Sequence, residues 1–272
     1  MREIKEVKEI SKIFESQLIE KLKTYYIIGG MPEVVYSWVN DKDIEKVNKI
    51  QKNILSSYEN YFSKHTDVFE ANKISLIWNG VPSQLARENK KFVYQVVKEG
   101  ERAREYEGAI NWLNDANLIF KCYLVSKYSF PLKAYHDLSA YKIYMNDIGL
   151  LRRMSNLDSS IILEGNKLLE EFKGAFTENY VLNALCYLID ESPNYYTFDR
   201  NEIDFIIQRK NKIIPTEVKS DKCTNHNSLT KYNINNDNEI AFRFSLMNLN
   251  KNGKIINIPL YFIEYINNLD LD

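Results

Sequence analysis

The chain has 272 residues, of which 44% are hydrophobic and 27% are charged, and its formal net charge is −1. This length and apolar content suffice for two domains with hydrophobic cores. A nearly neutral chain has no global attraction to nucleic acid, so any such binding has to depend on local basic patches. The N-terminal MREIKEVKEI lacks the apolar region of a signal peptide, and no stretch has the length and hydropathy of a membrane span. We therefore expect a cytoplasmic protein without membrane contact.

The first 40 residues predict a helix followed by the turn IIGGMPE. A phosphate-binding loop needs glycines whose backbone N–H groups cradle phosphates, together with Lys and Ser or Thr. Gly29 and Gly30 are followed by Met-Pro-Glu instead. The chain alone is therefore expected neither to bind nor to hydrolyse ATP.

Residues 41–157 are predicted to be mainly helical. KVNKIQKNILSSYENYF is followed by SLIWNGVPSQLAREN, in which Ser83 after Pro82 is typical of a helix N-cap. In the next helix, ERAREYEGAINWLNDAN, the apolar residues recur at helical spacing and predict a buried face, made of Tyr106, Ala109, Ile110 and Leu113. The strand-like LIFKCYLVS comes next, and this order of helix, turn, helix and strand is typical of a winged helix.

A winged helix either reads DNA or serves as a joint between proteins or domains. Arg102 and Arg104 are the candidate DNA contacts at the start of the third helix. Three glutamates lie beside them, which makes the cationic footprint weak and favours the structural role.

From Lys167 to Asp190 the sequence again has helical periodicity. Glu178 falls on the apolar stripe of this helix, four residues before Leu182 and seven before Leu185. A carboxylate on an apolar face is costly unless it has a partner, so Glu178 is a candidate metal ligand. The alternative is that Glu178 lies at the edge of a broad stripe.

The stretch RNEIDFIIQRKNKIIPTEVKS predicts a hairpin of two strands rich in β-branched residues. A turn centred between Lys210 and Asn211 places Asp204 opposite Glu217. Because side chains alternate along a strand, Asp204, Glu217 and Lys219 then share one face. A slip of one residue would separate them.

Two neighbouring carboxylates repel each other unless a cation lies between them. Mg²⁺ takes oxygen ligands and is commonly held by one or two carboxylates with water and substrate phosphate. Asp204 and Glu217 are therefore expected to bind Mg²⁺ or Mn²⁺, with the Val218 carbonyl as a further ligand and Lys219 near the attacking water. The alternative is a solvated hairpin edge, since E-x-K alone is a common tripeptide.

Scattered cysteines and histidines exclude several other site classes. Three cysteines without metal-ligand spacing predict reduced thiols and no zinc: Cys122, Cys186 and Cys223. The three histidines lie apart, and neither H-E-x-x-H nor G-x-S-x-G is present: His65, His136 and His226. Between Arg209 and Lys222 five basic residues and two acidic ones give a local charge of +3, although such runs are commonly only solvated faces.

A helix Glu, a strand Asp and E-x-K on the next strand, followed by the helix NSLTKYNI and the strands EIAFRFSL and PLYFIEYI, resemble the PD-(D/E)XK restriction-endonuclease-like superfamily. The phrases GGMPEVV, FKGAFTENYVL, NEIDFII and IPTEVKS also resemble the C-terminal part of AAA-type ATPases that carry domain-of-unknown-function family 4143. The resemblance implies that Glu178, Asp204, Glu217 and Lys219 form a nuclease-type site. Two departures are the missing ATPase core and Ile203 in place of the Pro before the strand Asp.

Together these features predict an α+β or α/β protein in three parts. Residues 1–40 would be a remnant of the ATPase lid, residues 41–157 a helical winged-helix-like domain, and residues 158–272 an αβββαβ nuclease-like domain. Three functions stay open: a metal-dependent nuclease acting on nucleic acid, with DNA as the expected substrate; a non-catalytic DNA- or protein-binding module of an ATPase; and the effector end of a machine whose ATPase core acts in trans.

Overall fold

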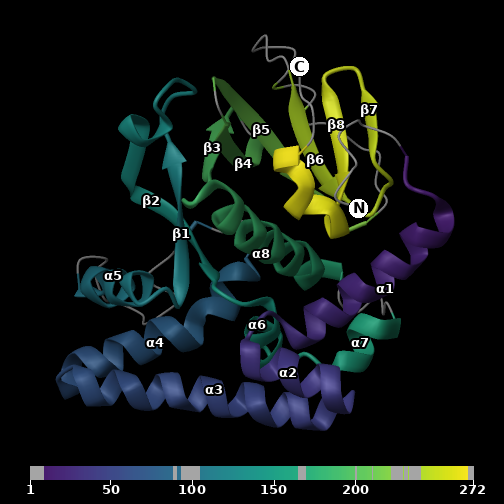
Figure 1. Ribbon diagram of the computed structural model, residues 1–272. Helices are drawn as coiled ribbons and strands as arrows, with labels where there is room; N and C mark the ends of the chain where they lie inside the picture. The colour runs from purple at the N-terminus through teal and green to yellow at the C-terminus, as the bar shows by residue number, and fades with distance from the viewer. Residues whose placement is uncertain are drawn as a thin grey trace. The chain divides into compact units, whose positions relative to one another are not determined.

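The computed structural model describes residues 9–87, 91–92, 105–164, 170–199, 201–209, 211–221, 229, 232 and 240–268 (Figure 1). It has both helices and an eight-stranded sheet and is of mixed α+β class. The chain divides into two compact units, each assembled from separate stretches. Unit 1 comprises Met1–Leu22, Cys122–Tyr141 and Tyr180–Asp272, and unit 2 comprises Lys23–Lys121 and Lys142–Asn179. The expected division into three contiguous domains stays a prediction.

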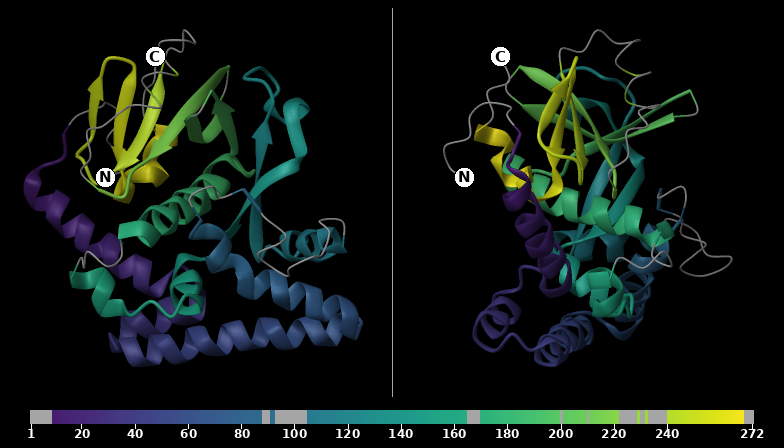
Figure 2. Two further views of the ribbon diagram at one scale, coloured as in Figure 1. Left: turned by 180° about the vertical axis from the view of Figure 1, so that it is seen from behind. Right: turned by 90° about the vertical axis from the view of Figure 1, so that its right-hand side faces the viewer.

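Unit 2 is mainly helical. Its helices are α2 (Pro32–Asp41), α3 (Ile44–His65), α4 (Val68–Leu85), α5 (Glu107–Asp115), α6 (Ile148–Met154) and α7 (Ser159–Glu164). Two further helices pass from one unit to the other, α1 (Lys12–Ile28) and α8 (Glu170–Ile189). Within unit 2, α3 and α4 run side by side, as Figures 1 and 2 show. None of the described helices is long and apolar enough to cross a membrane.

Helix α4 begins earlier than the sequence suggests. The Asp67 carboxylate accepts hydrogen bonds from the backbone N–H groups of Phe69 and Glu70, both at 2.9 Å, and caps the helix there. The helix then continues through Pro82, so the predicted N-cap at Ser83 is wrong. Its apolar face is fully buried on both sides of the proline, and this burial outweighs the one missing backbone hydrogen bond.

The next two elements, α5 and β1, agree with the predictions from the sequence. All four residues of the predicted buried face of α5 are at most 1% exposed: Tyr106, Ala109, Ile110 and Leu113. The predicted strand is β1 (Ile119–Val125). Arg102 and Arg104, the candidate DNA contacts, lie outside the described residues.

The turn after α1 is fixed by close packing against α6. The Asp147 carboxylate accepts hydrogen bonds from the backbone N–H groups of Gly30 at 2.7 Å and Leu150 at 2.8 Å. Gly29 has a φ of +71°, which favours glycine. A Cβ added at Gly149 would lie 2.6 Å from backbone atoms of Ile28 and Gly29, in the turn after α1. Because these glycines have no side chain, the end of α1 and the start of α6 can pack with their backbones in contact.

Buried polar side chains complete the end of α1. Gln51 Nε2 donates to the carbonyl of Ile27 at 2.9 Å and to that of Ile28 at 3.1 Å. The Arg152 guanidinium donates to the same Ile27 carbonyl at 3.2 Å and to Gln51 Oε1 at 2.7 Å. The last carbonyls of α1, which lack helical partners, are satisfied in this way by an amide and a cation.

The sheet lies largely in unit 1. Its strands are β1, β2 (His136–Met145), β3 (Asn194–Phe198), β4 (Asn201–Arg209), β5 (Lys212–Val218), β6 (Ala241–Ser245), β7 (Asn250–Asn252) and β8 (Ile255–Pro259). They follow the order β2-β1-β3-β4-β5-β6-β8-β7. The pairs β1–β3, β5–β6 and β6–β8 are parallel, whereas β3–β4, β4–β5 and β7–β8 are antiparallel. Of the predicted helix at 227–234, only Leu229 and Tyr232 are described, and both are buried in the core beside β4.

The predicted strand PLYFIEYI is wrong. Strand β8 ends at Pro259, and Leu260–Asn268 forms the 3₁₀ helix η5. Leu260, Ile263 and Ile266 are all buried. Their spacing of three matches the three residues per turn of a 3₁₀ helix, which places them on one face.

Candidate functional site

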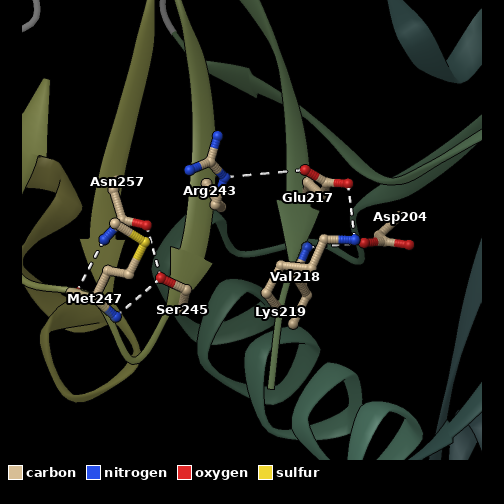
Figure 3. Close-up of polar contacts among 8 residues, drawn as sticks. All are labelled: Asp204, Glu217, Val218, Lys219, Arg243, Ser245, Met247 and Asn257. Atoms are coloured by element: carbon tan, nitrogen blue, oxygen red, sulfur yellow. Dashed lines mark hydrogen bonds and ion pairs between the residues drawn. The ribbon is translucent and has the colours of Figure 1, made fainter. Parts of the chain in front are cut away.

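Strands β4 and β5 form the predicted hairpin in the predicted register. Phe205 faces Thr216, and the next step along the ladder brings Asp204 opposite Glu217. The backbone N–H of Val218 donates to Asp204 Oδ2 at 2.8 Å, which fixes this carboxylate at the end of β5 (Figure 3). The hairpin therefore brings the two predicted acidic residues to the same end of neighbouring strands.

The Glu217 carboxylate lies between two cations. Its Oε1 is 2.9 Å from Lys219 Nζ, and its Oε2 is 4.0 Å from Arg243 Nε. Figure 3 shows the two carboxylate oxygens directed toward these partners on opposite sides. The side chains of Glu217 and Arg243 are 6% and 5% exposed, whereas that of Lys219 is 34% exposed. Within the described part of the chain, the buried Oε2 accepts no hydrogen bond.

Polar side chains continue across the sheet in one row. The parallel ladders align Glu217 of β5 with Arg243 of β6 and Arg243 with Asn257 of β8. Asn257 Oδ1 accepts a hydrogen bond from Ser245 Oγ at 2.7 Å, and Asn257 Nδ2 donates to the Met247 carbonyl at 2.9 Å. Four neighbouring strands thus each contribute one residue to this polar row: Asp204 of β4, Glu217 of β5, Arg243 of β6 and Asn257 of β8. Such a row is unusual, because polar groups normally avoid a buried sheet face.

This row lies near the carboxyl edge of the parallel strands. Strands β5, β6 and β8 end at Val218, Ser245 and Pro259, one or two residues beyond the row. In open α/β sheets, ligands bind outside the carboxyl ends of the strands. The position of the row is therefore typical of a binding or catalytic site.

Arg243 is the site residue that the sequence analysis misses. It lies in the strand AFRFS, in which all five residues are buried. A charged residue between two phenylalanines of a fully buried strand is the signal that identifies it, by the same reasoning that identifies Glu217.

Glu178 lies in the part of α8 that belongs to unit 2. It is 7% exposed, which agrees with its place on the apolar stripe, and its Oε2 accepts a hydrogen bond from the Tyr144 hydroxyl at 3.3 Å. The neighbouring Asn179 side chain binds both the N–H and the carbonyl of Met145, at 2.8 and 3.0 Å. Glu178 is therefore a buried, partnered carboxylate, and its role as a metal ligand stays a prediction.

The donor set of the site fits magnesium or manganese better than zinc. No group of three or more His, Cys, Asp and Glu side chains that could hold a metal occurs among the residues that the structure describes. Asp204 and Glu217 form a pair of carboxylates, and Mg²⁺ needs only one or two carboxylates besides water and substrate phosphate. The buried Oε2 of Glu217, to which none of the described residues donates a hydrogen bond, is an oxygen ligand suited to a hard cation.

Two family models match the chain. The model described as Domain of unknown function (DUF8612) matches residues 19–161, which is more than half of the sequence. The chain belongs to the DUF8612 family. In this DUF8612 protein, a second model, described as Domain of unknown function (DUF4143), matches residues 173–262 and confirms that part of the resemblance seen in the sequence. No curated protein and no solved structure matches the chain. The whole polar row of the DUF8612 protein lies within its DUF4143 match.

Proposed function

We propose that the protein is a metal-dependent nuclease that hydrolyses phosphodiester bonds in nucleic acid. The observation that carries this proposal is the register of β4 and β5, which brings Asp204, Glu217 and Lys219 together at the carboxyl edge of the sheet. Two carboxylates beside a lysine form a site that suits an anionic phosphodiester once a divalent ion is held between them.

Each site residue has a separate role in the proposed reaction. Asp204 and Glu217 would hold Mg²⁺ or Mn²⁺, with the Val218 carbonyl as a further ligand. When bound, the ion supplies Lewis-acid polarisation of a phosphoryl oxygen and a lower pKa for a coordinated water. The Lys219 ammonium, one residue beyond the end of β5 and partly exposed, would stabilise negative charge on the phosphoryl oxygens.

The finer fold assignment belongs to the same proposal. The order α8, β3, β4, β5 and β6, with the helical residues Leu229 and Tyr232 between the last two strands, supports an αβββαβ domain of PD-(D/E)XK type. The helices of residues 41–157 would act as a winged-helix joint, and an AAA-type ATPase core would act in trans.

A non-catalytic DNA- or protein-binding module is the second candidate. It is favoured by the cations around Glu217, because Lys219 and Arg243 compensate the buried carboxylate without any metal. A binding module of this kind would use the polar row as a structural element.

Metal titration separates the two candidates. We expect Mn²⁺ or Mg²⁺ binding, measured by isothermal titration calorimetry, to be lost in both Asp204→Ala and Glu217→Gln, because each change removes one of the two carboxylate ligands. Cleavage of labelled DNA and RNA oligonucleotides should disappear in the same variants. The exposed carboxylate of Glu264, elsewhere in unit 1, provides the control Glu264→Gln, which should bind metal and cleave like the wild type. Retention of full metal binding by both site variants would favour the binding module.

A further inference from the structure

The charges around Glu217 balance without a metal. Asp204 and Glu217 contribute two negative charges, and Lys219 and Arg243 contribute two positive ones. A buried carboxylate is costly without such compensation. The protein therefore stabilises its own site before any divalent ion arrives, and an arriving ion meets two resident cations.

The two cations are held differently. Lys219 follows the end of β5 and its side chain is 34% exposed, so its ammonium can turn into solvent when an ion binds. Arg243 lies in the interior of the sheet, is aligned with Glu217 by the β5–β6 ladder, and is flanked in sequence by the fully buried Phe242 and Phe244. Its guanidinium therefore stays beside Glu217 when the lysine leaves.

We propose that Arg243 is a built-in counterion of Glu217 that sets how tightly the site binds a divalent ion. This inference rests on the proposed function, since it concerns the metal held by Glu217. A positive charge near Oε2 compensates and orients the buried carboxylate, and the same charge repels a second cation at that carboxylate. Arg243 is thus a positioning residue that keeps metal affinity low.

The test is a calorimetric titration of Mn²⁺ into the 272-residue protein in the absence of nucleic acid. Because one neighbouring charge shifts an ionic equilibrium by about tenfold or more, Arg243→Met should bind Mn²⁺ about tenfold more tightly than the wild type. Arg243→Lys retains the charge and should bind like the wild type. Arg209→Met is the matched control, because Arg209 lies at the other end of β4, five residues and about 17 Å from Asp204. It removes the same charge from the chain and should leave the affinity unchanged.

The outcomes distinguish this inference from the nuclease proposal. Equal Mn²⁺ affinity in the wild type and Arg243→Met, with binding still lost in Asp204→Ala, would keep the metal site and overturn the role of Arg243. Weaker binding by a folded Arg243→Met would also overturn it, since the arginine would then support the ligands structurally. Absence of Mn²⁺ binding in the wild type and in every Arg243 variant would overturn both proposals. Where circular dichroism shows that Arg243→Met is unfolded, Arg243→Gln, which is neutral but polar, takes its place with the same expected gain.

Discussion

Lys219 combines an anchored backbone with a partly exposed side chain. Its backbone N–H donates to the Phe244 carbonyl at 2.8 Å, so the main chain is anchored to β6 just beyond the end of β5. Its ammonium lies 2.9 Å from Glu217 Oε1 and is partly exposed. Because its backbone is anchored and its ammonium is partly exposed, the lysine side chain can change position as charge develops during a reaction, which a fully buried group cannot do.

Replacing Lys219 by Ala is expected to separate metal binding from catalysis. The variant should bind Mn²⁺ at least as tightly as the wild type, because the lysine is not a ligand and its positive charge is removed. The cleavage rate should fall by about 10²–10³-fold, the range for loss of one group that stabilises transition-state charge. Calorimetry and single-turnover cleavage assays measure the two effects. Lys251→Ala, on the exposed strand β7, is the control, and unchanged cleavage by Lys219→Ala would contradict the assigned role.

The sequence predicts part of this site because some of its geometry is local. The turn between β4 and β5 fixes the register, so Asp204 and Glu217 can be paired by counting residues. Arg243 joins the same row through a parallel pair whose strands are separated by a long connection. No turn sets that register, and counting along the chain therefore cannot place Arg243 beside Glu217.

At the level of elements, the junction between α1 and α6 depends on the absence of a side chain at Gly149. We expect Gly149→Ala to destabilise the protein by about 1–3 kcal/mol or more, because the added Cβ would meet backbone atoms of Ile28 and Gly29 at 2.6 Å and these atoms cannot rotate away. Urea denaturation followed by circular dichroism measures the change in the free energy of unfolding.

The matched control for this change is another helical glycine. Among the described residues, no atom outside the local backbone of α4 lies within 4 Å of a Cβ added at Gly80. Gly80→Ala should therefore stabilise the protein by about 0.5–1 kcal/mol, because alanine loses less backbone entropy in a helix than glycine does. Equal effects of the two substitutions would show that the junction has room to relax.

Elements whose pattern is periodic are predicted best, and elements that compete with a tertiary contact are predicted worst. The buried face of α5 follows from helical spacing alone. The structure of PLYFIEYI does not follow from its pattern alone. The segment is rich in residues that favour strands, and its apolar residues also recur at a spacing of three. Burial of Leu260, Ile263 and Ile266 against the rest of unit 1 selects the 3₁₀ helix, and this packing cannot be read from the segment itself.

At the level of the whole molecule, buried phenols make stability depend on alkaline pH. Burial raises the pKa of Tyr26 and Tyr128 well above the ordinary value near 10, and that of Tyr261 to about 12. The folded state therefore retains these protons at a pH where the unfolded chain has released them. Stability present below pH 10 is lost as the pH rises further, at about 1.4 kcal/mol per pH unit for Tyr26, whose hydroxyl oxygen is buried.

Urea denaturation at a series of pH values above 9 measures this loss, and tyrosinate absorbance reports the phenols that ionise on unfolding. Tyr26→Phe removes one of these protons and should reduce the slope of stability against pH by about 1.4 kcal/mol per pH unit. Tyr36→Phe is the control, since Tyr36 is 74% exposed. Identical slopes in Tyr26→Phe and the wild type would contradict the expectation.

The boundary between the two family matches does not coincide with a boundary in the structure. Strand β1 lies within the DUF8612 match and β3 within the DUF4143 match, yet they pair in one sheet, with Leu124 beside Tyr195. The side chain of Asn248 binds the backbone of Ile10 through both its carbonyl and its amide, so a stretch that precedes both matches belongs to the same unit. A recombination event between residues 161 and 173 would therefore split a continuous sheet instead of exchanging a module. A change in one matched stretch that disturbs the β1–β3 pairing therefore also alters the environment of a strand in the other.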